Sequence, residues 1–286
     1  MNRRQLCRLG LLASLLPGTA FAAATDNSDF GDLIHGGQLT QGGWLRGRVP
    51  GGTRSLTLDG KPVDFAADGD FLIAFDRDAG PHAMLAASLS ATSAANPLRS
   101  HELLVTPRRW ELEHIPLGPP PGTAPSEEFL RRRAAEVARI EAARATDSHS
   151  DGWRQSFIWP THGRISGRFG AQRIYNGTPA AYHSGVDIAG GAGSAIIAPA
   201  DGVVILAAEA PFTLEGHLLM VDHGMGLNSA FLHCSQLLVG VGDPVHQGQL
   251  LARVGMTGRA TGPHLHWSMK WRDSRLDPML FAGAMG

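Results

Sequence analysis

Apolar and polar residues alternate over short stretches of residues 31–108, which is the pattern of half-buried β-strands. Residues 55–58 (SLTL) alternate and run into Asp59-Gly60, a dipeptide typical of tight hairpins. Asp68-Gly69 marks a second turn, and the alternation resumes over 71–75. We therefore expect a small all-β domain here, and a sandwich of immunoglobulin-like type fits the pattern.

The next stretch reads as a linker followed by a helix. Residues 115–125 (IPLGPPPGTAP) are rich in proline and glycine, which favours a linker. A helix is expected from about Ser126 to Ala145, with Glu127 and Glu128 in its first turn. Its narrow apolar stripe comprises Leu130, Ala134, Val137 and Ile140. We expect this stripe to dock on a domain, and we group 109–151 as linker plus helix.

Residues 152–286 contain many short apolar runs separated by glycines, with turn signals every ten residues or so. The runs lie at 196–197, 203–206, 218–221, 237–239 and 250–251. Nothing of helical length interrupts them until near the end of the chain. This pattern predicts an all-β core, so the chain as a whole is expected to be mainly β.

The first 22 residues have the features of a cleaved signal peptide. Three arginines, Arg3, Arg4 and Arg8, precede a short apolar run, and Ala20-Phe21-Ala22 fits a small-x-small cleavage site. The apolar run is too short to span a bilayer as a helix. The segment predicts export, to the periplasm or beyond, with a mature chain that starts at Ala23. The sequence leaves open whether export uses the general or the twin-arginine route.

The charge and cysteine content narrow the function classes. Removing 1–22 takes away three arginines and no acids, so the formal charge moves from −1 to −4. This gives no electrostatic reason to expect nucleic acid or an anionic membrane as a partner, and no other segment is apolar enough to be transmembrane. Cys7 leaves with the signal peptide, and Cys234 alone cannot form an internal disulfide. We expect Cys234 to be a small buried residue.

Histidines and an aspartate carry the candidate chemistry. His264 and His266 stand two residues apart in GRATGPHLHWSM, so in a strand both imidazoles face one side. His183 and Asp187 form a second cluster in YHSGVDIAG, and both side chains can converge if the backbone bends between them. His233 lies between the two clusters in FLHCSQL. Imidazole and carboxylate are ligands that zinc prefers, and spare histidines can transfer protons, so the set indicates a metal-dependent hydrolase.

The motifs that hold these residues resemble a known family. HSGVD (183–187), VDHGMGLNSAFLHCS (221–235), VGDPVHQGQLLARVGMTGRATGPHLH (241–266) and LDPML (276–280) are similar to the lysostaphin/LytM-type zinc endopeptidases, in its exported Gram-negative branch. The resemblance covers about half of the chain. It implies an antiparallel β-sheet metallopeptidase domain of the duplicated hybrid motif type at 152–286. The N-terminal β-sandwich-like domain at 31–108 resembles accessory domains of that branch only loosely.

The resemblance also implies roles for the five residues. His183, Asp187 and His266 correspond to ligands of Zn²⁺, and His233 and His264 to catalytic histidines. Three protein ligands leave a fourth tetrahedral position open for water, as a catalytic zinc needs. The substrate implied is a peptide cross-link of peptidoglycan, with the D-alanyl–diaminopimelate bond favoured over a polyglycine bridge. The sequence does not decide which of His233 and His264 is the general base.

Other conspicuous residues have more ordinary interpretations. His223 matches a histidine common in the family, and we expect a structural or supporting role for it. The remaining histidines of this region, His162, His217 and His246, are expected at the surface. Four residues are expected to shape the loop before His264 without direct chemistry: Thr257, Gly258, Thr261 and Gly262. Tyr182 is open to substrate contact or to packing, and Trp44 is expected in a core.

Three other functions compete with hydrolysis of cross-links. Some relatives have lost metal ligands and activate cell-wall amidases, and the five residues present here argue against that function, although an added or autoinhibited regulatory role stays open. The segment VGDPVHQGQLLARVG (241–255) resembles the hairpin of biotinyl or lipoyl carriers, but such a carrier needs an attachment lysine there, and neither Lys61 nor Lys270 lies in a tight hairpin of that motif. A carboxypeptidase on the same peptides is the third alternative, and the resemblance favours endopeptidase action. Protein partners and the role of the N-terminal domain cannot be inferred.

Overall fold

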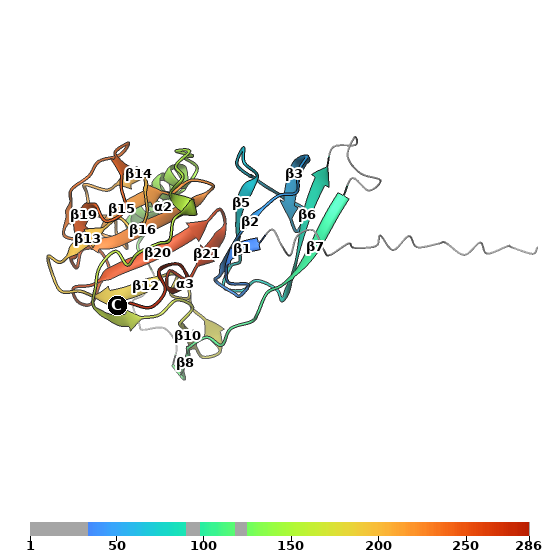
Figure 1. The fold of residues 1–286 in the computed structure, drawn as a ribbon. Helices are drawn as coiled ribbons and strands as arrows, with labels where there is room; N and C mark the ends of the chain where they lie inside the picture. Colours follow the sequence, from blue (N-terminus) through green and yellow to red (C-terminus); the bar gives the residue numbers. More distant parts are fainter. Residues whose placement is uncertain (1–33, 90–97, 118–124, 286) are drawn as a thin grey trace, which may run out of the picture.

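The structure of the protein, a computed structural model, describes residues 34–89, 98–117 and 125–285. The predicted signal peptide, Cys7 and part of the Pro-rich linker lie outside these residues. Two lobes lie side by side, an N-terminal lobe of strands β1–β7 and a larger C-terminal lobe that holds most of the remaining strands (Figure 1). The named strands pair antiparallel in every sheet except for one parallel contact between β8 and β10. The prediction of a mainly β chain with antiparallel sheets is confirmed.

The N-terminal lobe is built from two small sheets. One sheet has the order β1-β2-β5 and the other β4-β3-β6-β7. Their strands are β1 (Ile34–Gly37), β2 (Trp44–Arg48), β3 (Thr53–Leu58), β4 (Lys61–Val63), β5 (Asp70–Ala74), β6 (His82–Leu89) and β7 (Leu98–Leu104). Apolar residues from both sheets, among them Leu56, Phe71 and Leu85, are fully buried between them. Strands β3 and β4 form the predicted hairpin, and Asp59 and Gly60 both have positive φ, as a two-residue turn requires.

The C-terminal lobe contains an eight-stranded sheet and a three-stranded sheet. The large sheet has the order β18-β14-β15-β16-β20-β12-β9, and β21 pairs with β20. Its strands are β9 (Arg164–Gly167), β12 (Val186–Ala189), β14 (Gly202–Ala207), β15 (His217–Asp222), β16 (Leu227–Cys234), β18 (Pro244–Val245), β20 (Leu265–Trp271) and β21 (Ser274–Leu276). The small sheet joins β13 (Ala195–Ile197), β19 (Leu250–Arg253) and β17 (Gln236–Leu237). The apolar runs predicted strands at these places, although the run at 237–239 forms a strand only over its first residue.

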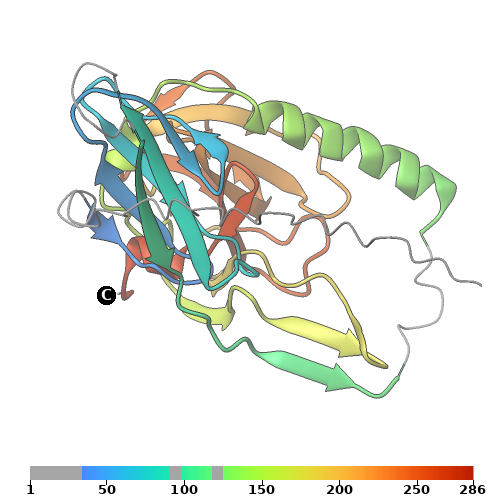
Figure 2. The same cartoon turned by 90° about the vertical axis from the view of Figure 1, so that its right-hand side faces the viewer.

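Helix α2 (Glu127–Arg144) forms where a helix was predicted, and it runs along the C-terminal lobe (Figure 2). The Ser126 hydroxyl caps it by accepting a hydrogen bond from Phe129 N at 3.1 Å. The helix docks through Ala143 and Ile140 on an apolar cluster that includes Met220 and Ala230. The predicted stripe is wrong in its first half, because Leu130 and Ala134 are exposed.

The buried position on that side of α2 is Glu136, a charged residue that no hydrophobic pattern would select. Its carboxylate accepts hydrogen bonds from Thr213 N at 2.8 Å and from Thr213 Oγ1 at 2.5 Å. Arg132 and Arg133 pair with the same carboxylate. These partners replace water around the charge, so the helix can turn this face inward.

The two lobes are held together by packing and by polar contacts. Strand β8 (Leu112–Ile115), which follows the N-terminal lobe, pairs with β10 (Gln172–Tyr175), and β11 (Thr178–Pro179) completes that sheet. Trp44 stacks on Phe281 of the short helix α3 (Met279–Ala282) with ring centroids 4.8 Å apart, and its Nε1 donates to Leu280 O. Trp44 is therefore a packing residue, as expected, and it packs at the contact between the lobes.

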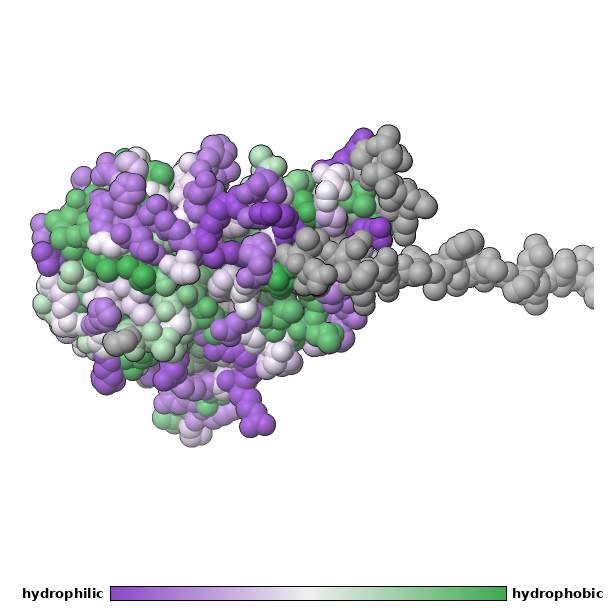
Figure 3. All heavy atoms as spheres, viewed as in Figure 1, coloured by the Kyte–Doolittle hydropathy of each residue, from purple (hydrophilic) through white to green (hydrophobic). Residues whose placement is uncertain are grey.

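Most buried apolar residues of both lobes belong to one contiguous cluster, which reaches from Leu45 to Phe281, and the cluster beneath α2 is separate from it. The division of the chain at 31–108, 109–151 and 152–286 stays a prediction. On the face drawn in Figure 3, hydrophilic and hydrophobic residues are intermixed over both lobes. Within the described part of the chain, no helix is long and apolar enough to cross a membrane.

Candidate metal centre

Two neighbouring strands in the middle of the large sheet bring the first two candidate residues together. Asp187 of β12 lies directly opposite His266 of β20 in the antiparallel register. Residues that face each other across two strands project to the same side of the sheet. Their side chains therefore meet, although 79 positions separate them in the sequence.

His183 reaches the same point from outside the strands. It lies ahead of β12, and its backbone is fixed by two hydrogen bonds, from His183 N to Ala171 O and from Gly170 N to His183 O, both at 2.8 Å. The turn at Ser184 and Gly185 then leads into β12. The expected convergence of His183 and Asp187 is observed.

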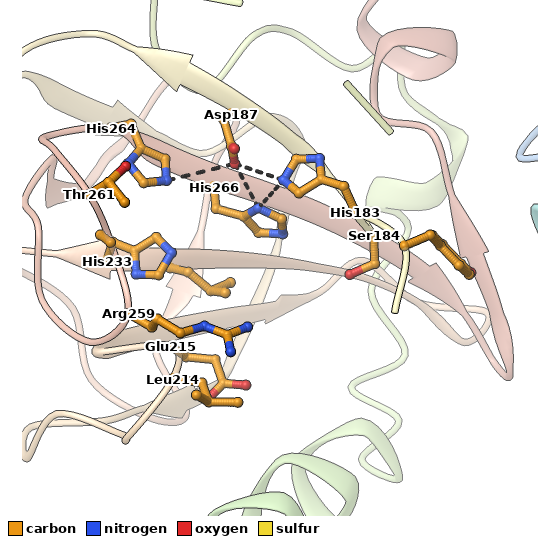
Figure 4. Close-up of a pocket in the computed structure, with 13 residues that line it drawn as sticks. His183, Ser184, Asp187, Leu214, Glu215, His233, Arg259, Thr261, His264 and His266 are labelled. Carbon is orange, nitrogen blue, oxygen red and sulfur yellow. Dashed lines mark hydrogen bonds and ion pairs between the residues drawn. The ribbon is translucent and has the colours of Figure 1, made fainter. Parts of the chain in front are cut away.

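Three atoms of these residues face one another at short distances (Figure 4). His183 Nε2 lies 3.0 Å from Asp187 Oδ1 and 2.9 Å from His266 Nδ1. His266 Nδ1 lies 2.8 Å from Asp187 Oδ1. The three residues are partly or fully buried and form a cluster that could hold a metal ion.

The hydrogen bonds around the cluster decide which atoms carry lone pairs. His183 Nδ1 lies 3.0 Å from Arg168 O, and because a carbonyl can only accept, this nitrogen donates. In the neutral ring His183 Nε2 then has a lone pair, which points at the carboxylate of Asp187 and at His266 Nδ1. Three electron-rich atoms packed this closely need a proton or a cation between them. Two imidazole nitrogens and a carboxylate oxygen suit zinc, so the residues fit such an ion.

The electrostatics of the cluster are those of a tightly paired buried site. Burial lowers the pKa of His183, but the hydrogen bond to Asp187 and its charge outweigh burial and raise this pKa overall. Burial raises the pKa of Asp187, yet hydrogen bonds from His183 and His266 hold it well below its usual range. Burial also keeps the pKa of His266 low. Asp187 is therefore ionised at neutral pH and supplies the negative charge of the site.

The two remaining candidate histidines border the same pocket. His264 directly precedes β20, and its Nε2 lies 3.8 Å from Asp187 Oδ1, while its Nδ1 donates to Gly262 O at 2.8 Å. The ring of His233 lies 4.9 Å from that of His264, and its Nδ1 donates to Thr257 O at 2.8 Å. Both rings thus have their Nδ1 proton fixed on a backbone carbonyl, which leaves Nε2 with a lone pair when the ring is neutral. Burial lowers the pKa of His233 to about 4, so this ring is neutral at pH 7.

The pocket encloses about 350 Å³ and is lined by all five candidate residues. Tyr182 and Thr261 also line it, as do three residues for which the sequence analysis gave no role: Leu214, Glu215 and Arg259. Arg259 lies within the motif GRATGPHLH, so its place near the site could have been found from the sequence. Glu215 could not, because it lies in the connection between β14 and β15 and reaches the pocket only through the fold.

The other conspicuous side chains follow their expectations, with one exception. Cys234 is fully buried, and burial raises the pKa of its thiol to about 12, so it is no nucleophile. His162 and His246 are exposed as expected. His217 is not at the surface, because its ring is partly buried and its Nδ1 donates to Ala208 O at 3.0 Å. The sequence has no signal for this, since the contact depends on how β15 pairs.

His223 is fully buried, away from the pocket. Its Nδ1 donates to Asp201 O at 2.8 Å, so its Nε2 accepts from the hydroxyl of Ser229 at 2.9 Å. Ser229 Oγ in turn accepts a hydrogen bond from Trp267 Nε1 at 3.3 Å. This network joins strands β15, β16 and β20 beneath the site, which is the structural role expected for this histidine.

Comparison with known proteins agrees with this arrangement. Residues 181–278, which include all five candidate residues, match the family model described as Peptidase family M23. The chain carries an M23 domain. A crystal structure from Pseudomonas aeruginosa that is described as peptidase M23 superimposes with a TM-score of 0.65 at 29% sequence identity, covering 87% of this chain and 96% of that one. The similarity to this structure therefore extends beyond the M23 domain into the N-terminal lobe.

The curated relatives include proteins of two different functions. Peptidoglycan DD-endopeptidase ShyA of Vibrio cholerae is 35% identical over 117 residues, which are 41% of this chain and 27% of that protein. Murein hydrolase activator NlpD of Salmonella dublin is 29% identical over 167 residues, 58% of this chain and 41% of that protein. The chain thus spans less than half the length of these relatives. The M23 domain relates it to peptidoglycan hydrolases, and both an enzyme and an activator are among its relatives.

Proposed function

We propose that this protein is a zinc-dependent endopeptidase that hydrolyses peptide cross-links of peptidoglycan. One observation carries the proposal: His183 Nε2, Asp187 Oδ1 and His266 Nδ1 converge within 3.0 Å, and two more histidines line the same pocket. An activator that binds a partner enzyme has no need for this donor set. The likeness to ShyA supports the same substrate class.

In this proposal His183, Asp187 and His266 hold the zinc. When bound, the ion would lower the pKa of a water molecule and polarise the scissile carbonyl. The chain contributes the two fixed imidazoles. His233 and His264 each present Nε2 toward the pocket, where one can take a proton from water and the other can hydrogen-bond the developing oxyanion or the leaving amine.

The favoured bond is the D-alanyl–diaminopimelate cross-link, and the favoured location is the periplasm, reached through the signal peptide at 1–22. The activator NlpD supports a second candidate function, in which the protein regulates a cell-wall amidase without hydrolysis of its own. The two functions differ in whether the purified protein alone cleaves cross-links.

The test is mass spectrometry of muropeptides after purified mature protein acts on cross-linked sacculi, with and without a zinc chelator. We expect cross-linked dimers to become monomers, and the chelator to stop this conversion. The masses of the products name the bond and separate endopeptidase from carboxypeptidase action. Zinc-loaded protein that leaves the dimers intact, but stimulates an added amidase, would replace the proposal with the activator function.

A further inference from the structure

The face of the sheet that carries His266 continues along β20 to a second polar position. His266, Ser268 and Lys270 alternate along this strand and share one face, while Trp267 and Met269 point into the apolar core. Four residues of strand separate His266 from Lys270, which corresponds to about 13 Å. Between them lies the partly exposed Ser268, and its neighbour in β16 is Ala230, which is buried in the apolar cluster on which α2 docks.

Lys270 lies in a row of polar residues that crosses the sheet. Its neighbour in β16 is Asn228, and its neighbour in β21 is Arg275. Two like charges directly opposite each other destabilise an antiparallel pair. Arg144 in the last turn of α2 adds a third cation, since its charge acts on both Lys270 and Arg275. We refer to Arg144, Lys270 and Arg275 as the basic cluster.

The cations of the basic cluster are not paired one to one with acids within the described part of the chain. No salt bridge there includes any of its three residues, and the buried Arg144 Nε has no hydrogen-bond partner. The acids that act on Lys270 are Asp273 and Asp76, and Asp76 already accepts hydrogen bonds from Tyr182 Oη and Arg275 N. Burial and the charge of Arg275 lower the pKa of Arg144 to about 10, although the carboxylate of Glu215 acts in the opposite direction.

The cluster is also continuous with the pocket. The guanidinium of Arg275 lies 5.5 Å from the centre of the Tyr182 ring, and Tyr182 lines the pocket beside His183. A peptide that lies along β20 with its scissile bond at the metal centre would therefore extend over Ser268 toward Lys270. An arginine and a lysine that form no salt bridge at such a place are suited to bind a carboxylate.

We propose that Arg144, Lys270 and Arg275 form a subsite that binds a carboxylate of the substrate peptide, about four extended residues from the bond that is cleaved. This inference rests on the proposed function for its substrate class. In this proposal, this end of the sheet recognises stem peptides by their free carboxylates. A peptide whose carboxylates are amidated would bind there more weakly.

The test compares two synthetic D-alanyl–diaminopimelate cross-linked peptides, one with free carboxylates and one with these carboxylates amidated. Binding to the zinc-loaded full chain is measured by fluorescence anisotropy, and cleavage of the same pair is followed separately. We expect roughly tenfold tighter binding of the free-carboxylate peptide. Lys270→Gln should reduce this ratio to near one, and Arg275→Gln should reduce it in the same direction. Lys61→Gln is the matched control, because Lys61 is the other lysine of the chain and is exposed on β4.

The ratio of two dissociation constants does not depend on the fraction of active protein, so partial misfolding of a variant does not imitate the effect. Equal binding of both peptides by the unaltered protein, no binding of either one, or an unchanged ratio in Lys270→Gln would overturn the subsite. A carboxylate preference that Lys270→Gln removes, in a protein that cleaves neither peptide, would keep the subsite and overturn the endopeptidase. Cleavage of both peptides with equal kcat/KM, together with equal affinity for both, would keep the endopeptidase and overturn the subsite.

Discussion

The unusual backbone conformation of His233 places its side chain at the pocket. It has φ of 65°, a left-handed conformation that is uncommon outside glycine, at the end of strand β16. Its backbone N–H donates to Glu215 O and its ring Nδ1 to Thr257 O, both at 2.8 Å. These bonds hold the conformation against its cost and place the ring at the pocket. Sequence periodicity has no signal for such a departure from the strand.

The division of labour among the five residues can be tested directly. We expect His183→Ala to abolish zinc binding, because it removes one of three ligand atoms. His264→Ala should retain one zinc per chain while turnover falls by about 10² or more, since only proton transfer or oxyanion stabilisation is lost. Metal content by mass spectrometry and cleavage of a cross-linked peptide give the two readings. Loss of zinc from His264→Ala to the same extent as from His183→Ala would make His264 a ligand instead.

Gly185 is required by close packing around His266. A Cβ at this position would lie 2.4 Å from Trp267 O and 2.7 Å from His266 Nε2. We expect Gly185→Ala to lower zinc affinity at least tenfold and to destabilise the fold by about 1 to 3 kcal/mol, because β20 or the ring of His266 must shift. Titration with zinc and urea denaturation measure the two effects. Gly51→Ala is the control, since a Cβ at Gly51 meets nothing within 4 Å.

His223 gives the stability of the protein a dependence on pH. Burial lowers the pKa of this ring to about 4, below the ordinary value of 6.5. The unfolded state therefore binds a proton first as the pH falls, and the folded state loses stability between about pH 6.5 and pH 4. From pH 7 to pH 5 this amounts to about 2 kcal/mol.

The measurement for His223 is urea denaturation at both pH values. His223→Gln should be less stable at pH 7, because the network with Ser229 is disrupted, but it should lose about 2 kcal/mol less than the unaltered protein on going to pH 5. The same pH dependence in both proteins would assign the acid sensitivity to other groups.

At the scale of elements, the position of α2 in the sequence could be predicted, but the face with which it docks on the C-terminal lobe could not. Capping by Ser126 and the acidic first turn fix where the helix begins, and both are local features. The face that docks depends on Thr213, which comes 77 residues after Glu136 and supplies two hydrogen bonds to it. The hydrophobic stripe alone therefore predicted the wrong face of the first turns of α2 to be buried against the C-terminal lobe.

The same contact gives a test of how α2 is held. Glu136→Ala removes the carboxylate of a residue that is 6% exposed and leaves two donors of Thr213 without their acceptor, while Arg133 keeps its pair with Glu215. We expect the free energy of unfolding to fall by about 2 to 3 kcal/mol. Glu128→Ala on the exposed first turn should change it by less than about 0.5 kcal/mol. Thermal denaturation of both variants decides, and equal effects would contradict the role given to Glu136.

At the scale of the whole molecule, several ion pairs join the lobes, and the most buried of them in the described part of the chain lies between Arg108 and Asp277. Arg108, which follows the N-terminal lobe, donates to Asp277 Oδ2 at 2.8 Å, and Asp277 N donates to Gly42 O at 2.8 Å. The side chain of Asp277 is 3% exposed. The motif LDPML thus contributes to the contact between the lobes, and its first residue also ends the last strand of the large sheet.

Removing one partner would leave the buried carboxylate uncompensated. We expect Arg108→Ala to destabilise the protein by about 2 to 3 kcal/mol, and Arg108→Ala combined with Asp277→Asn to regain part of this loss. Arg173→Ala is the matched control, because its pair with Glu113 is 63% exposed on each side and should contribute less than about 1 kcal/mol. Urea denaturation measures all three. A cost for Arg108→Ala no larger than that for Arg173→Ala would show that this ion pair does not hold the lobes together.

The sequence by itself determined the strands, the helix and the candidate residues, because alternation, turn dipeptides, caps and metal-binding residue types are local properties. It could propose that His183, Asp187 and His266 converge, from a resemblance in motif order. Only the tertiary structure decided how the rings of His183 and His233 are turned, because the carbonyls of Arg168 and Thr257 that fix them come from other segments. It also decided the rotation of α2 and the row of cations at Lys270, since register and docking depend on partners far away in the chain.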